Sequence, residues 1–64
     1  MSTYEERAKV AAEARGWFIN KDGNFATILG TDVEDVVDNI SPTDPGAWGT
    51  LCHMEGIEVP GDDT

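Results

Sequence analysis

The first hydrophobic positions along the chain repeat at the spacing of a helix. Alanine, the strongest helix former, dominates this segment. The predicted helix begins at Ser2 or Thr3, where the hydroxyl side chain and Glu5 or Glu6 three residues later form a capping box. Gly16 is the expected cap at its C-terminal end. The stripe expected to be buried contains Tyr4, Ala8, Ala11 and Arg15, with Val10 and Ala14 beside it.

Two short hydrophobic runs on either side of Asp22-Gly23 follow and predict a β-hairpin. The Asp-Gly dipeptide favours a tight turn because glycine adopts positive φ without steric cost. A turn closed at this dipeptide pairs Asn20 with Phe25, Ile19 with Ala26, Phe18 with Thr27 and Trp17 with Ile28. One face of the ribbon is then hydrophobic (Trp17, Ile19, Ala26, Ile28) and the other is mixed (Phe18, Asn20, Phe25, Thr27). The first helix is expected to cover the hydrophobic face.

A second interpretation of this region is a helix-turn-helix. Ala26, Gly30 and Val36 have the spacing of that motif, which makes residues 24–29 helical and the fold all-α. The Phe, Thr and Ile side chains in the run favour a strand. We therefore expect the hairpin, with the all-α fold as the alternative.

The stretch from Thr31 to Ile40 has the pattern of an amphipathic helix. Thr31 and Glu34 match a capping box. The hydrophobic positions at i, i+3, i+4 and i+7 predict a buried stripe. That stripe is Val33, Val36, Val37 and Ile40, and the acids Asp32, Glu34, Asp35 and Asp38 lie away from it.

The last part of the chain predicts a loop and one more helix. Prolines interrupt residues 41–46, and a short helix follows from Pro45 or Ala47 to Glu55. Gly56 is expected to cap this helix, with Ile57 folding back in a Schellman motif. Residues 59–64 read as a flexible polar tail. The predicted fold is a single α+β domain over residues 1–64, with a helix, a hairpin and two short helices in that order.

Charge is distributed unevenly over this architecture. The net charge is −9, and every Lys and Arg lies in residues 1–30, where four bases balance four acids. Residues 31–64 contain nine acids and no Lys or Arg. This arrangement argues against direct nucleic-acid binding, which requires basic groups facing phosphates. Solubility and adaptation to high salt are competing explanations for the acidity.

The sequence contains no recognisable constellation for catalysis. Cys52 is the only cysteine, so an intrachain disulfide or a thiolate-rich zinc site cannot form. His53 is its neighbour, but adjacent helical residues point about 100° apart. We expect Cys52 to be buried and His53 to lie at the surface, with no enzyme activity, cofactor or metal. The absence of a long apolar run and of a signal-peptide pattern predicts no membrane span and a cytoplasmic location.

These observations favour a non-enzymatic protein–protein interaction module. Its acidic second half, residues 31–64, would face a basic partner surface. One alternative is an inhibitor of a nucleic-acid-binding protein that mimics phosphate charge, as small phage or mobile-element proteins with anti-CRISPR or anti-restriction activity do. Another is a structural subunit or homo-oligomer that packs through an exposed Trp48 or the mixed hairpin face. The candidate partner-binding residues are Asp32, Glu34, Asp35, Asp38, Asp44 and Trp48.

Overall fold

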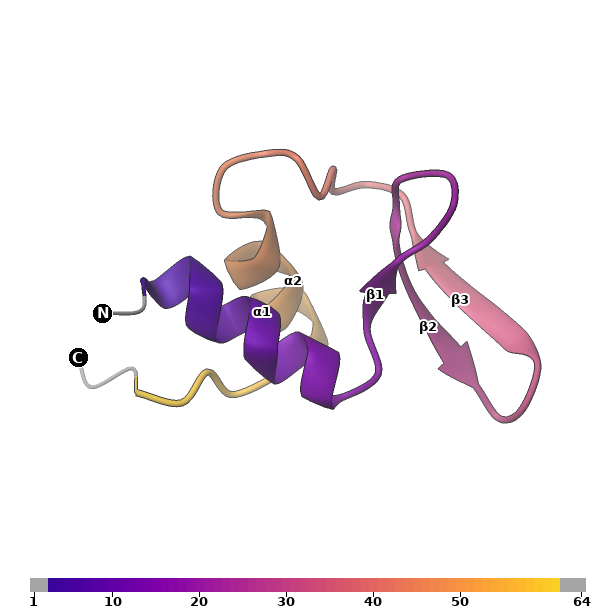
Figure 1. The fold of residues 1–64 in the computed structure, drawn as a ribbon, viewed down its shortest axis with the longest axis horizontal. Coiled ribbons are helices and arrows are strands. Elements are labelled where there is room, and N and C mark those ends of the chain that lie inside the picture. Colours follow the sequence, from indigo (N-terminus) through magenta and orange to yellow (C-terminus); the bar gives the residue numbers. More distant parts are fainter. Residues whose placement is uncertain (1–2, 62–64) are drawn as a thin grey trace.

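A computed structural model describes residues 3–61, and within them it contains two helices and a three-stranded antiparallel sheet (Figure 1). The elements in chain order are α1 (Tyr4–Ala14), β1 (Phe18–Ile19), β2 (Phe25–Leu29), β3 (Val33–Val37) and α2 (Ala47–Glu55). The predicted α+β class is confirmed. The all-α alternative is wrong, because residues 25–29 form the central strand of the sheet.

The start of α1 and the end of α2 are as the sequence predicts, whereas the C-cap of α1 is Arg15 and not Gly16. At the start of α1, the Glu6 N–H donates to Thr3 Oγ1 (3.1 Å), and the Thr3 N–H donates to Glu6 Oε1 (2.8 Å). This is the predicted capping box. At the end of α2, Gly56 has a φ of 70°, and the Ile57 N–H donates to the Cys52 carbonyl at 2.9 Å. The Schellman motif is therefore confirmed, and Ile57 is buried.

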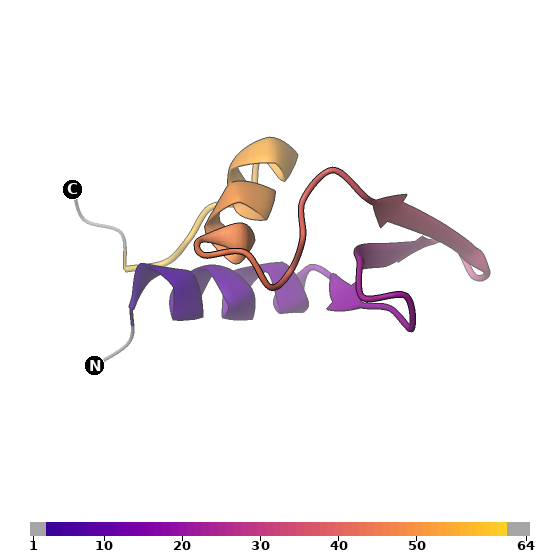
Figure 2. The ribbon, with the colours of Figure 1, turned by 90° about the horizontal axis from the view of Figure 1, so that it is seen from above.

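The two helices pack side by side through small residues (Figures 1 and 2). At Gly49 of α2, an added Cβ would lie only 2.8 Å from Cε2 of Tyr4. Because glycine has no Cβ, Gly49 allows α1 to approach α2 at close range. The predicted stripe of α1 is partly wrong, because Tyr4, Val10 and Arg15 are exposed. The buried residues of α1 are Ala8, Ala11 and Ala12.

The hydrophobic core lies between the helix pair and the near end of the sheet. The rings of Phe25 and Trp48 meet edge to face, with centroids 4.6 Å apart and an interplanar angle of 65°. Trp48 is 7% exposed, which corrects the expectation that it lies on the surface. Val59 is also buried in this core, so the predicted flexible tail does not begin there. Residues 62–64 of that predicted tail lie outside the described residues.

The register of the first hairpin differs by one residue from the predicted one. The observed pairs are Phe18 with Ala26 and Ile19 with Phe25. The Asn20 side chain explains the shift, because its Oδ1 accepts from the N–H groups of Asp22 and Asn24, both at 3.0 Å. The chain therefore uses a three-residue loop, residues 21–23, with Gly23 at a φ of 80°. A one-residue shift moves each side chain to the other face relative to its partner strand.

The predicted helix over Thr31–Ile40 is wrong, because Val33–Val37 is strand β3. It pairs with β2 through five residue pairs, from Phe25–Val37 to Leu29–Val33. Gly30, with a φ of 69°, begins the connecting turn. The three valines are β-branched and pack well on a pleated surface. This segment is a strand because β2 lies beside it and pairs with it. The hydrophobic periodicity of a single segment carries no information about such a neighbouring strand.

The sheet continues beyond the helices instead of lying beneath them. In Figures 1 and 2 the helix pair occupies one end of the molecule, and β2 and β3 project from the other. The principal extents of 36 × 23 × 19 Å reflect this end-to-end arrangement. Only the part of the sheet nearest the helices, around Phe25, joins the core. Within the described residues, neither α1 nor α2 covers the far part of the sheet (Figure 2).

Candidate partner-binding surface

Six large hydrophobic side chains on the strands are exposed to solvent. Cross-strand partners share a face, so the row Phe18–Ala26–Val36 defines one face and the row Ile19–Phe25–Val37 the other. We call these six side chains the sheet surface. On the first face they are Phe18 (37% exposed), Ile28 (46%) and Val36 (42%), and on the second face Ile19 (49%), Leu29 (53%) and Val33 (57%).

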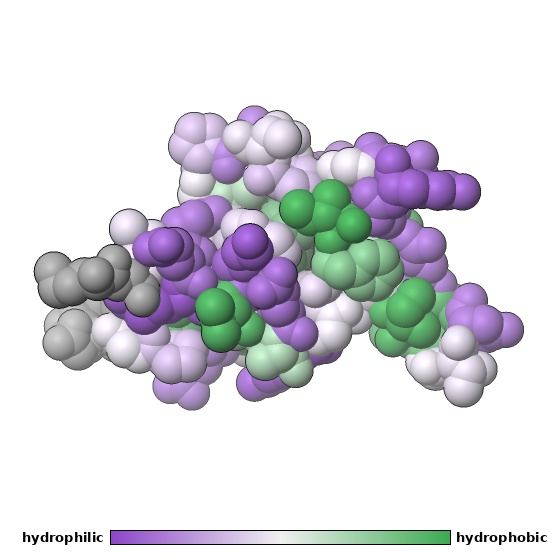
Figure 3. Space-filling model, in the orientation of Figure 1, coloured by the Kyte–Doolittle hydropathy of each residue, from purple (hydrophilic) through white to green (hydrophobic). Residues whose placement is uncertain are grey.

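The hydrophobic side chains are concentrated over the sheet rather than spread over the molecule. On the side seen in Figure 3, the largest group of hydrophobic residues covers the strands, and a smaller one lies over α1. The Ala26 side chain on the first face is fully buried between its cross-strand neighbours Phe18 and Val36. This row therefore forms a continuous hydrophobic band across all three strands.

Two of the predicted acidic residues lie within this hydrophobic surface. Glu34 is opposite Ile28 on the first face, and Asp35 is opposite Thr27 on the second. Asn20 holds the Glu34 carboxylate in place, because its Nδ2 donates to Oε2 at 2.9 Å. The register places Phe18 on the same face as Glu34. Each face therefore combines exposed hydrophobic groups with one carboxylate from β3.

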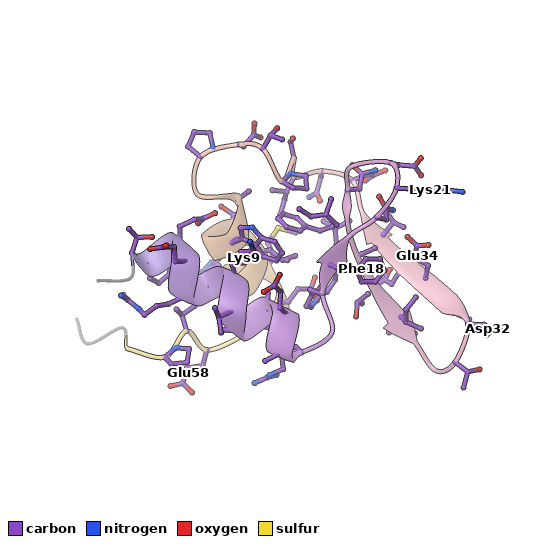
Figure 4. All side chains as sticks on the ribbon, viewed as in Figure 1. Lys9, Phe18, Lys21, Asp32, Glu34 and Glu58 are labelled. Atoms are coloured by element: carbon purple, nitrogen blue, oxygen red, sulfur yellow. The ribbon has the colours of Figure 1, made fainter. Side chains whose placement is uncertain are left out.

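The structure places the other predicted residues around β3 or away from it. Asp32 lies at the tip of the β2–β3 hairpin (Figure 4), and Asp38 directly follows β3; both are exposed. Asp44 is also exposed but lies in the separate loop before α2, where its N–H donates to the Ser41 carbonyl. Trp48 belongs to the core. Four of the six predicted residues thus lie in the outer strand or directly beside its ends, not along one side of a helix.

The outer edge of β3 presents unpaired backbone groups. The Asn20 N–H donates to the Asn24 carbonyl, so Asn24 directs its backbone groups toward β1. Along an antiparallel strand, successive residues direct their N–H and C=O groups alternately to one neighbouring strand and the other. Phe25, Thr27 and Leu29 consequently turn their backbone groups toward β3. Their partners on β3 are the residues at 37, 35 and 33. The intervening residues, Glu34 and Val36, therefore direct their N–H and C=O groups away from β2. Within residues 3–61, no other strand lies beyond β3.

No protein-family model, curated protein or solved structure matches this chain. A candidate site is therefore identified from the geometry of the sheet alone. Of the six hydrophobic residues of the sheet surface, the sequence indicated only Phe18, as part of the mixed hairpin face, and the other five were missed. Because the predicted register was wrong by one residue, Ile19 and Ile28 were assigned to the face that the first helix was expected to cover.

The residues suited to nucleophilic or metal chemistry are not assembled into a site. Cys52 is buried, and its Sγ donates to the Ala8 carbonyl at 3.3 Å. Burial, with a smaller contribution from the Glu5 carboxylate, raises the pKa of this thiol. His53 is exposed. Among the described residues, no three or more His, Cys, Asp or Glu side chains converge on a position that could hold a metal ion.

A hollow between α1 and the segment after α2 is lined by Ala11, Ala14, Arg15, Glu58 and Pro60. It contains no nucleophile. Neither helix of the described chain has the length and apolar character needed to cross a bilayer.

Proposed function

We propose that the chain is a non-enzymatic interaction module that binds a basic protein partner through its sheet. The observation that carries this proposal is the exposure of six large hydrophobic side chains beside Glu34 and Asp35 on a projecting sheet. Contiguous exposed hydrophobic groups bordered by charge are typical of protein-binding surfaces. The hydrophobic side chains supply the buried area, and the carboxylates select a partner of opposite charge.

The charge distribution supports a basic partner in particular. Residues 31–64 contain no Lys or Arg, so acids along β3 have no basic neighbour from their own half of the chain. Complementary charges mainly increase the association rate and exclude wrong partners, whereas the hydrophobic contacts sustain the complex. The proposed surface uses both kinds of contact.

The phosphate-mimic hypothesis is a narrower form of the same proposal. It requires the partner to be a nucleic-acid-binding protein, and it predicts that duplex DNA competes with the chain for that partner. A mimic acting through charge alone does not need exposed hydrophobic groups beside its acids, whereas β3 has valines on both sides of Glu34 and Asp35. We therefore favour a mixed hydrophobic and acidic contact over pure charge mimicry.

The test is capture of the partner with matched charge variants. The affinity-tagged chain is incubated with a lysate of the organism that encodes it, in parallel with Glu34→Lys/Asp35→Lys. The control is Glu13→Lys/Glu55→Lys, which makes the same change in net charge at exposed positions on the helices. Captured proteins are identified by mass spectrometry and then purified for a binding titration against salt.

The proposal predicts one partner that binds the wild-type chain and the control but is lost with Glu34→Lys/Asp35→Lys. Its affinity should fall about tenfold or more between roughly 50 mM and 500 mM salt, because exposed charges are screened beyond a few ångströms at the higher concentration. Replacing Phe18 with Ser should also weaken binding. A partner that binds all charge variants equally would contradict the proposal, and so would an affinity independent of salt.

A further inference from the structure

We infer that the free edge of β3 binds an extended basic segment of the partner by β-strand addition. This inference rests on the proposed function and specifies how the partner is recognised. The outward N–H and C=O groups of Glu34 and Val36 are the hydrogen-bonding groups that an added strand requires. β3 is five residues long, a common length for a strand.

The positions of the two acids favour binding at the edge over binding on a face. Glu34 and Asp35 point to opposite faces of the sheet, so a partner resting on one face reaches only one of them. A strand added beside β3 has side chains on both faces and meets both carboxylates. It also meets Val36 on one face and Val33 on the other, both of which are exposed.

The same acids argue against a second copy of this chain as the occupant. If two β3 strands pair antiparallel about a twofold axis through Asp35, that residue faces its own copy. If the axis passes through Glu34 instead, that glutamate faces its own copy. Like charges placed directly opposite each other on adjacent strands are destabilising. Basic residues at these two positions make the contact favourable.

The order of residues in β3 predicts the sequence pattern of the partner segment. A strand that pairs antiparallel with β3 runs along it from Val37 to Val33. Its five residues then lie opposite Val37, Val36, Asp35, Glu34 and Val33 in turn. Matching hydrophobic with hydrophobic and acid with base gives the pattern hydrophobic, hydrophobic, basic, basic, hydrophobic. The adjacent basic residues point to opposite faces, each toward one carboxylate.

The experiment uses a fluorescein-labelled synthetic peptide with the central sequence Val-Ile-Lys-Arg-Val and flanking Gly-Ser residues. In the antiparallel arrangement, the peptide's Ile and Arg pair with Val36 and Glu34, so their N–H groups face β3. One derivative is N-methylated at Ile and Arg. The matched control is N-methylated at Lys and the final Val, whose N–H groups face away. Affinities are measured by fluorescence anisotropy at low salt.

Loss of two backbone hydrogen bonds should weaken binding by roughly tenfold or more, whereas the control should bind within about threefold of the parent peptide. The Glu34→Lys/Asp35→Lys chain should lose binding of the parent peptide. Equal weakening by the two methylation patterns overturns strand addition, and so does failure of the parent peptide to bind. If the natural partner still depends on Glu34 and Asp35 in those cases, only this inference fails and the proposed function stands.

Discussion

The clearest quantitative prediction concerns Glu5, a residue of α1 that caps the other helix. The N-cap of α2 is Gly46, which has no side chain to accept hydrogen bonds from the first turn. Glu5 takes its place, because its Oε2 accepts from the Trp48 N–H at 2.7 Å and its Oε1 from the Gly49 N–H at 3.0 Å. One carboxylate thus satisfies two backbone donors and joins the helices.

The magnitude follows from these two contacts. A hydrogen bond to a charged group contributes about 1.5–3 kcal/mol, and loss of a helix cap costs about 0.5–2 kcal/mol. Glu5 is half-buried, and water can partly replace it in Glu5→Ala. We therefore expect the free energy of unfolding to fall by about 2–3 kcal/mol. The whole stability of a 64-residue chain is on the order of 3–10 kcal/mol.

Urea unfolding followed by tryptophan fluorescence measures this loss, because Trp17 and Trp48 are both buried. Glu5→Gln should be intermediate, since the amide keeps one accepting oxygen but has no charge. The matched control is Glu13→Ala, an exposed acid in the last turn of α1, which should change stability by less than about 0.5 kcal/mol. If Glu5→Ala is no more destabilising than Glu13→Ala, the carboxylate does not cap α2.

Three further predictions concern the core, a turn and the thiol. Leu51→Ala should cost about 2–5 kcal/mol in urea unfolding, because the side chain is fully buried, whereas the exposed Met54→Ala should cost little. Gly23→Ala should cost about 1–2 kcal/mol of thermal stability through its positive φ alone, since no atom lies within 4 Å of an added Cβ; an equal effect of Lys21→Ala would contradict this. Because the pKa of Cys52 is raised in the folded chain, the thiol of the unfolded chain ionises at a lower pH than the folded one. The stability that depends on this thiol being protonated is therefore complete below about pH 9 and is lost as the pH rises through the folded pKa. Denaturation curves should show that decline in the wild type and less of it in Cys52→Ala.

The sequence predicted α1 and α2 well because the signals for these two helices are local. The capping box of Thr3 and Glu6 and the motif at Gly56 each depend on residues within one turn of the helix. The valines of β3 were misread because positions 33 and 37 share a face in a helix and also in a strand. Thr31 resembles an N-cap, yet it lies in the turn between two strands. Only the presence of β2 beside this segment distinguishes the two structures.

The candidate surface was predictable in its charge but not in its shape. Acids can be counted from sequence, and Glu34, Asp35 and Asp38 are exposed as expected. The exposure of Leu29 and Val33 depends on how far the sheet projects past the helix pair. That distance is set by tertiary packing around Phe25 and Trp48, which no local pattern encodes. For the same reason, Trp48 was expected at the surface and lies in the core.

Amide hydrogen exchange along β3 tests most directly whether this strand is the partner-binding edge. In the free chain, Val33, Asp35 and Val37 should exchange slowly, because their N–H groups bond to β2, whereas Glu34 and Val36 should exchange fast. Addition of the captured partner should slow exchange at Glu34 and Val36. If these two amides stay fast while protection appears only on the helices, the partner binds elsewhere and the account is wrong.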